Sequence, residues 1–266
     1  MEYSLLFALI LTTLAGLATG LGGLLVLFSQ RADHRTLARA LGFSAGVMLY
    51  VSVLELLPEA HKRLSEMMAA GAWLILLLAF LGGVLLIWSI DRLVPEPINP
   101  HSTLGLGDEG RTINAEERRL ARLGLLAALA IAVHNFPEGV ATLFSALSEP
   151  GVGLSVALAI GLHNLPEGVA VALPLYHAYG SRRRAVGLSF AAGLAEPLGA
   201  IVAYGLLWSF LTDGLMGVML ALVAGIMVYI SLEQLVPHAR RYGRDRDTLY
   251  SLLAGVAAMI LLLPLF

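Results

Sequence analysis

The sequence predicts an all-α membrane protein with eight transmembrane helices. Of its 266 residues, 58% are hydrophobic and only 14% are charged, whereas soluble domains carry about 25% charged residues. Long apolar runs recur from one end of the chain to the other, and a helix of about 20 apolar residues crosses the hydrocarbon core of a bilayer. The chain contains no Cys, which excludes disulfides, thiolate metal sites and cysteine nucleophiles.

Charged segments, or segments rich in Gly and Pro, separate the apolar runs. Gly and Pro within a run do not argue against a helix, because both are frequent in membrane helices. The first run lacks the basic n-region and the cleavage site of a signal peptide, so we expect it to be the first helix. The eight predicted spans, which make residues 1–266 a single transmembrane domain, are about 3–28, 37–60, 72–91, 119–147, 152–178, 185–210, 214–238 and 247–265.

The basic residues predict the orientation of these spans in the bilayer. The loops after the first, third, fifth and seventh spans, with their flanks, hold 15 of the 17 Lys and Arg, and only Lys62 and Arg63 lie on the other side. The positive-inside rule then places both termini outside the cytoplasm. Residues 92–118, with three Pro and the stretch LGLGDEG, are predicted to form a flexible cytoplasmic loop. A net charge of −2 gives no reason to expect a nucleic-acid partner.

Two near-copies of one polar segment occupy the fourth and fifth spans. Residues 129–141 read LAIAVHNFPEGVA and residues 158–170 read LAIGLHNLPEGVA, with ten of thirteen positions identical. The His and Glu of each copy stand four residues apart, which places them on one face of a helix. Both copies lie near the middle of their predicted spans, and ionisable residues inside a membrane span indicate a functional site by default. The polar residues of the two copies are His134, Asn135 and Glu138, and His163, Asn164 and Glu167.

Imidazole nitrogens and carboxylate oxygens are ligands for Zn²⁺, Fe²⁺, Mn²⁺ and Co²⁺. Two His and two Glu that converge would form a four-ligand site. One alternative is a hydrogen-bonded polar cluster that joins two helices, but the duplicated HNxPEG pattern favours metal. A second alternative is an intramembrane metal-dependent hydrolase, which uses the same His–Glu spacing but needs an open ligand position for water. Duplication in antiparallel helices suits transport better, so we expect neither catalytic residues nor a catalytic cofactor.

Three further carboxylates, those of Glu55, Glu196 and Glu233, lie in or near apolar segments without Lys or Arg at the same depth. Buried carboxylates without a basic partner must bind protons or a cation. Glu196 precedes a Pro, which repeats the Glu and Pro pairing of the central motifs, so it is a predicted ligand. The residues that could line the entrance are Glu55, Glu59 and His61, and those that could line the exit are His177, Glu233 and His238. A solvated helix end explains Glu59 and His61 equally well.

A second internal match links the second and seventh spans. Residues 45–60, AGVMLYVSVLELLPEA, and residues 224–239, AGIMVYISLEQLVPHA, agree at eight of sixteen positions. These two spans run in opposite directions, as do the fourth and fifth. Matching sequence in opposite orientation is typical of the inverted repeats of secondary transporters, whose sites lie at the repeat interface. Chance similarity between two helices rich in Ala, Gly and Leu is the alternative.

With HNFPEG, HNLPEG and the segment GFSAGVMLYVSVLELLPEA, the chain resembles the ZIP family of divalent-metal transporters and, within it, the ZupT-like bacterial branch. The resemblance implies inverted repeats around helices 4 and 5, a homodimer, and a place in the bacterial cytoplasmic membrane. It also implies uptake of zinc, with iron, manganese, cobalt and cadmium as further substrates.

The resemblance also implies ligand sets for two ions. His134, Glu138, His163 and Glu167 would hold the first ion. The second ion would lie among Asn135, Glu138, Asn164, Glu167 and Glu196, with Glu138 and Glu167 bridging the two. Met48 matches a residue that lines the first site in some relatives, although its sequence context alone suggests simple packing.

Overall fold

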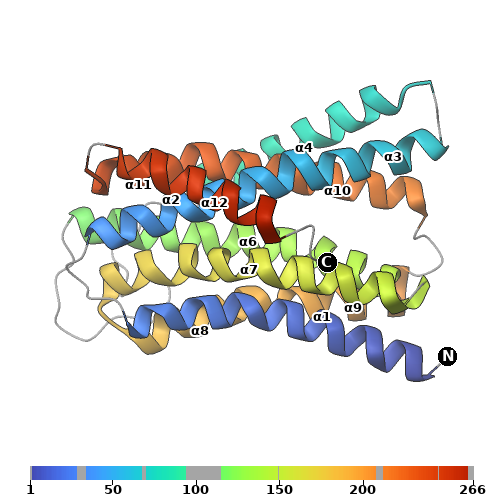
Figure 1. Cartoon of the computed structure of the whole chain (residues 1–266), viewed down its shortest axis with the longest axis horizontal. Coiled ribbons are helices and arrows are strands. Elements are labelled where there is room, and N and C mark those ends of the chain that lie inside the picture. The colour runs from blue at the N-terminus through green and yellow to red at the C-terminus, as the bar shows by residue number, and fades with distance from the viewer. Residues whose placement is uncertain are drawn as a thin grey trace.

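The computed structural model describes residues 2–28, 34–67, 70–93, 115–148, 150–207, 212–244 and 246–262. Within these ranges every regular element is helical and no strand occurs. The helices lie roughly side by side along the long axis of the molecule (Figure 1). The predicted all-α class is therefore confirmed for this part of the chain.

The first half of the chain contributes α1 (Glu2–Gly23), a 3-10 turn η1 (Leu24–Leu27), α2 (His34–Tyr50), a π-helical segment η2 (Val51–Leu56), α3 (Leu57–Met67), α4 (Ala72–Leu93) and α6 (Ala115–Ser148). The second half contributes α7 (Pro150–Tyr179), α8 (Arg182–Gly193), α9 (Ala195–Val202), a π-helical segment η3 (Ala203–Leu207), α10 (Asp213–Tyr229), a π-helical segment η5 (Ile230–Leu235), α11 (Val236–Tyr242) and α12 (Asp247–Leu262). The predicted loop 92–118 is shorter at both ends than expected, because α4 and α6 extend into it; residues 94–114 lie outside the described ranges.

Seven helical stretches of the described chain are long and apolar enough to cross a membrane. The stretch Asp247–Leu261, which corresponds to the eighth predicted span, is shorter. Many large apolar side chains point outward, among them Leu78 and Leu85, each 60% exposed, and helices that are apolar all round are typical of membrane spans. The membrane class is thus supported, whereas the count of eight and the position of the termini stay predictions.

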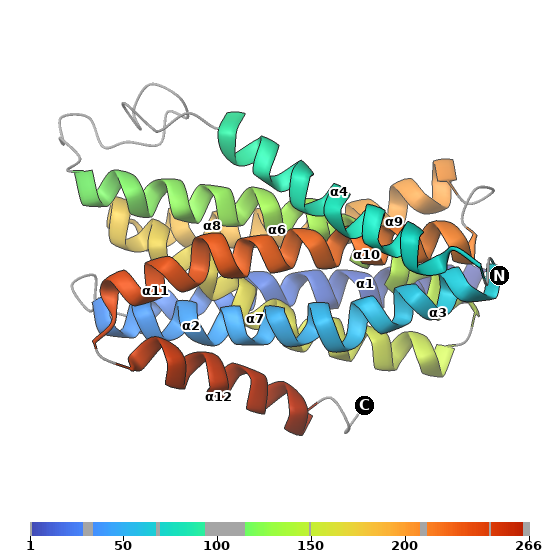
Figure 2. The same ribbon diagram turned by 90° about the horizontal axis from the view of Figure 1, so that it is seen from above.

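The helices form two closely packed groups. In one group α7 packs against α1, α6 and α8, and in the other α2 packs against α12 while α10 packs against α4 and α3. Figure 2 shows α12 alongside α2 at one edge and α4 crossing the bundle obliquely. The groups meet where α2 contacts α7 and α10 contacts α6. Both helices that carry the central motifs therefore lie at this boundary.

The match between residues 45–60 and 224–239 extends to backbone detail. Both segments change from α- to π-helix at the equivalent residue, at Val51 in η2 and at Ile230 in η5. Both also use a Ser hydroxyl to donate to a Met carbonyl four residues earlier: Ser52 Oγ to the Met48 oxygen at 2.6 Å, and Ser231 Oγ to the Met227 oxygen at 2.8 Å. A Pro follows shortly after each π segment and lacks the N–H that a regular helix needs there, so the same local sequence produces the same π-helical segment twice.

Candidate metal centre

The two central motifs meet through crossed His–Glu pairs. On α6, His134 Nε2 lies 3.0 Å from Glu167 Oε2 of α7, and on α7, His163 Nε2 lies 3.3 Å from Glu138 Oε1 of α6. All four side chains are at least 95% buried. The His of each motif copy thus contacts the Glu of the other copy. The four side chains together form one polar layer between α6 and α7.

The neighbouring Asn side chains tie this layer to α1 and to the α8–α9 break. Asn164 Nδ2 donates to the Ala15 carbonyl oxygen and to Glu196 Oε2, both at 2.9 Å. Asn135 Nδ2 donates to the Ala192 carbonyl oxygen at 3.4 Å. Glu196 has no exposed surface, so the structure brings this predicted ligand to the same buried layer.

The helices approach closely enough here that two glycines are required. A Cβ on Gly139 of α6 would overlap the carbonyl oxygen of Glu196, and a Cβ on Gly168 of α7 would overlap that of Thr19 in α1. Small residues at such crossings let membrane helices pack backbone to backbone. Because each glycine follows its motif Glu, the close contact fixes the depth of that carboxylate relative to α1 and α9.

The carboxylates and amides of the layer retain buried oxygens that accept no hydrogen bond. These atoms are Glu138 Oε2, Glu167 Oε1, Glu196 Oε1, Asn135 Oδ1 and Asn164 Oδ1. In the described ranges no Lys or Arg forms an ion pair with any of the three carboxylates. Leaving a buried acceptor unpaired costs about 1–3 kcal/mol, and oxygen atoms of this kind are ligands for divalent cations.

The His and Glu side chains are arranged as two separate pairs and not as one complete coordination site. Over the described residues, no three His, Asp or Glu side chains are placed to hold one ion together. Each imidazole nitrogen that faces a carboxylate is engaged with it. Metal ligation requires neutral His and ionised carboxylate, so a cation would have to replace the hydrogen bonds of both pairs.

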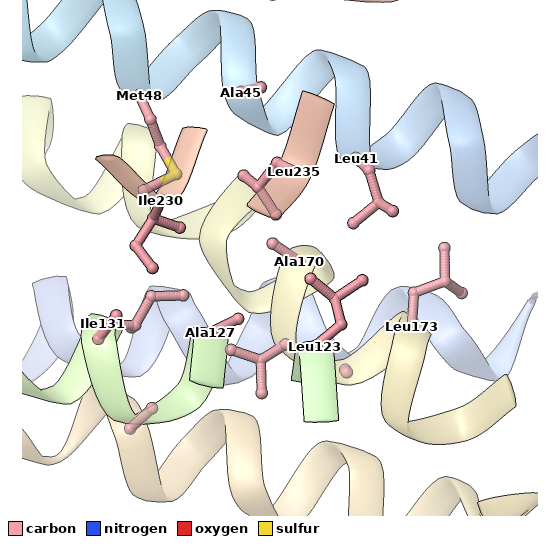
Figure 3. Packing of buried hydrophobic residues seen from close by; sticks show 14 of the residues in the cluster. Leu41, Ala45, Met48, Leu123, Ala127, Ile131, Ala170, Leu173, Ile230 and Leu235 are labelled. Carbon is pink, nitrogen blue, oxygen red and sulfur yellow. The ribbon is translucent and has the colours of Figure 1, made fainter. Parts of the chain in front are cut away.

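Met48 is fully buried in the apolar core that borders α6 and η5. Figure 3 shows it beside Ile230, with Ile131 of α6 on the far side of Ile230. These neighbours support the packing role that its sequence context suggests.

The residues predicted to line an outer entrance have structural partners. Glu59 pairs with Arg63 at 2.7 Å, and the His61 ring lies 3.8 Å, centre to centre, from the Trp73 ring. This arrangement agrees with the alternative of a solvated helix end for both residues. Glu55 is half-buried within η2 and is the entrance candidate that lies deepest in the span.

Of the residues predicted to line an exit, His177 and His238 lie near the same ring cluster, formed with His34 and Tyr242. His177 is buried, and its Nδ1 lies 2.9 Å from the Leu173 oxygen. His238 is half-buried in α11, and Glu233 is exposed on η5. His34, which the sequence did not predict as a site residue, has its ring 5.7 Å from that of His177 and 5.5 Å from that of Tyr242. A lone His at the start of a helix carries no sequence signal that could have predicted this contact.

The family model described as ZIP Zinc transporter matches residues 100–263. A protein of Chlorobium luteolum named Zinc transporter ZupT is 53% identical over 260 residues, which cover 97% of each chain. Proteins of the same name from Lysinibacillus sphaericus and Streptococcus mutans are 49% and 46% identical over 100% of this chain and 99% and 100% of their own.

These relatives are zinc transporters and not enzymes, which counts against the hydrolase alternative. The family match covers more than half of the chain, and the similarity to the relatives extends over its whole length. The chain therefore belongs to the ZIP zinc transporter family.

Proposed function

We propose that this protein carries divalent metal ions, chiefly zinc, into the cytoplasm through the polar layer between α6 and α7. The observation that carries the proposal is the pair of crossed His–Glu contacts, buried at the depth of the apolar spans and surrounded by oxygens that accept no hydrogen bond. A hydrogen-bonded cluster whose only role was to join helices would pair these oxygens. A cation that gives up its water ligands needs such oxygen atoms as replacement ligands.

The proposed first ion is held by His134 and His163 with the carboxylates of Glu138 and Glu167. The proposed second ion uses the same two carboxylates together with the side chains of Asn135, Asn164 and Glu196. Nitrogen and oxygen ligands accept most first-row divalent ions, so iron, manganese, cobalt and cadmium are further proposed substrates.

The proposed setting is a bacterial cytoplasmic membrane that the chain crosses eight times, with both termini outside and a homodimer as the assembly. The relatives from Chlorobium luteolum and Lysinibacillus sphaericus are bacterial proteins. Ions would enter on the side of Glu55, Glu59 and His61, and would leave on the side of His177, Glu233 and His238.

The test measures zinc entry into proteoliposomes that contain a zinc-sensitive dye. The wild-type protein is expected to admit zinc, and the variant Glu167→Ala is expected to admit none while it inserts normally. Glu66→Ala is the matched control, because Glu66 is an exposed Glu near the end of α3. Wild-type protein without zinc flux would refute the proposed function. A Glu167→Ala variant with wild-type flux would refute only the ligand assignment.

A further inference from the structure

The chain contains a third internal match that joins α1 to the α8–α9 break. Residues 15–22 read AGLATGLG and residues 192–199 read AGLAEPLG, so six of eight positions agree. One of the two differences places Thr19 in α1 where the other copy has Glu196. Of these two matching segments, only the α8–α9 copy therefore supplies a carboxylate, that of Glu196, to the proposed second ion.

The structure places Thr19 and Glu196 at equivalent points. A Cβ on Gly16 would lie 3.1 Å from the Glu196 Cβ, and a Cβ on Gly193 would lie 3.1 Å from the Thr19 Cβ. The motif Asn residues repeat this relationship, since Asn164 donates to the carbonyl of residue 15 and Asn135 to that of residue 192. The Asn164–Glu196 contact thus has a counterpart position formed by Asn135 and Thr19.

Thr19 differs from the other Thr residues of α1. The hydroxyls of Thr12 and Thr13 donate to the carbonyl oxygens four residues earlier, at 2.8 and 2.7 Å. Thr19 has no exposed surface and its Oγ1 has no hydrogen-bond partner. The carbonyl it would ordinarily use, that of Ala15, instead accepts from Asn164. The Oδ1 of Asn135 is also buried without a partner.

We propose that the Thr19 hydroxyl, together with Asn135 Oδ1, is a ligand position for the transported cation and forms the neutral counterpart of Glu196 and Asn164. This inference rests on the proposed function. The axis of an inverted repeat lies in the membrane plane and exchanges the two membrane faces, so Thr19 and Glu196 are displaced toward opposite faces. Each residue lies in the second half of its span, which puts Thr19 in the cytoplasmic half for the proposed orientation.

Because Glu196 is a carboxylate and its counterpart Thr19 is a hydroxyl, the affinity for the cation is expected to decrease from the Glu196 position toward the Thr19 position. Cation affinity rises with the number of charged ligands, so an ion held by Glu196 is bound more tightly than one held by Thr19. A neutral ligand on the cytoplasmic side would let the ion leave inward without meeting a second strong site.

The test uses four variants of the full-length protein, with equilibrium zinc binding, zinc uptake and metal-free melting temperature measured for each. Thr19→Val keeps the shape and removes the hydroxyl, and Thr19→Ser keeps the hydroxyl. Thr12→Val is the matched control, because its hydroxyl is already paired within α1. Thr19→Glu gives the α1 copy the carboxylate that Glu196 provides in the α8–α9 copy.

Thr19→Val is expected to weaken zinc binding about fivefold, the effect of about 1 kcal/mol lost from the complex. Its metal-free melting temperature is expected to stay the same or rise, because the variant removes a buried hydroxyl without a partner. Thr19→Ser and Thr12→Val are expected to bind zinc like the wild type. Thr19→Glu is expected to bind zinc about tenfold more tightly and to release it more slowly, so that uptake falls.

Equal zinc affinity in Thr19→Val and Thr12→Val would overturn the proposal. A weaker affinity accompanied by a lower metal-free melting temperature would also overturn it, since that combination indicates a structural role. If Thr19→Val does not fold, the zinc affinity of Thr19→Glu decides, and a wild-type value counts against Thr19. Zinc flux in the wild type that disappears in Glu167→Ala would leave the proposed function intact in each of these cases.

Discussion

His134 Nε2 lies 3.0 Å from Glu167 Oε2, so a residue of the first motif copy pairs with a residue of the second. Within one helix His134 and Glu138 share a face, yet each His is hydrogen-bonded to the Glu of the other helix. The contacts run between the helices, from His134 to Glu167 and from His163 to Glu138. The centre therefore depends on the packing of α6 against α7, and a change in either helix affects both pairs.

The pairing predicts strong coupling between His134 and Glu167. Removing one partner of a buried hydrogen-bonded pair leaves the other without a partner and costs about 1–3 kcal/mol. His134→Ala and Glu167→Ala are each expected to lower the melting temperature in detergent, and the double variant is expected to lower it by less than the sum. Glu116→Ala, which removes a carboxylate paired with the distant Arg241, is expected to combine additively with His134→Ala. Additive loss in the first cycle would contradict the pairing.

The sequence predicted the helical class and the layer of the central motifs, because both depend on local patterns. Apolar runs mark spans wherever they occur, and the near-identity of residues 129–141 and 158–170 identified the polar residues directly. The crossed contacts also involve those residues. What the spacing alone could not predict is which Glu each His contacts, because that choice depends on the crossing of α6 and α7.

Two features of the fold were missed for different reasons. The π-helical segments interrupt what reads as ordinary apolar helix, and a hydrogen-bond shift inside a helix has no hydrophobic signature. The match of residues 15–22 with 192–199 was visible in the sequence, but it spans only eight positions. In addition, Thr19 is uncharged where the other copy has Glu196, so a search for charged residues inside the spans does not find it.

Zinc should stabilise the protein in proportion to its occupancy of the centre. A ligand at 100 times its dissociation constant adds about 2.7 kcal/mol to the free energy of unfolding. The wild type and Glu66→Ala are expected to melt at a higher temperature with zinc than with a chelator. Glu138→Ala and Glu167→Ala are expected to melt at the same temperature in both conditions. A zinc-induced increase that survives in both of these variants would place the bound ion elsewhere.

The Asp247 carboxylate is expected to matter more for stability than that of Asp213. Asp247, at the start of α12, accepts hydrogen bonds from Arg35 at 2.8 Å and Arg39 at 3.1 Å, and its side chain is only 8% exposed. Hydrogen bonds to a charged group stabilise a fold more than hydrogen bonds between neutral groups. Asp247→Asn is therefore expected to lower the melting temperature clearly and to loosen α12 from α2, which limited proteolysis can detect.

Asp213 is the matched control for this substitution. Its carboxylate pairs with Arg63 at 2.8 Å, but its side chain is 58% exposed, and exposed ion pairs contribute about 0–1 kcal/mol. Asp213→Asn is expected to melt close to the wild-type temperature. Equal destabilisation by the two substitutions would show that burial of the carboxylate is not what makes the Asp247 contact important.

The close packing of α6 against α9 and of α7 against α1 predicts that Gly139 and Gly168 tolerate no side chain. A methyl group on Gly139 or Gly168 would meet the carbonyl oxygen of a neighbouring helix, and overpacking of this kind costs about 1–3 kcal/mol. Gly139→Ala and Gly168→Ala are expected to melt at a lower temperature and to lose zinc uptake, because the adjacent carboxylate must move with its helix. Gly82→Ala in α4 is the control, because nothing lies within 4 Å of the added carbon. That substitution is expected to stabilise by about 0.5–1 kcal/mol and to leave uptake unchanged. Full uptake in Gly139→Ala would mean that the contact of α6 with α9 does not set the position of Glu138.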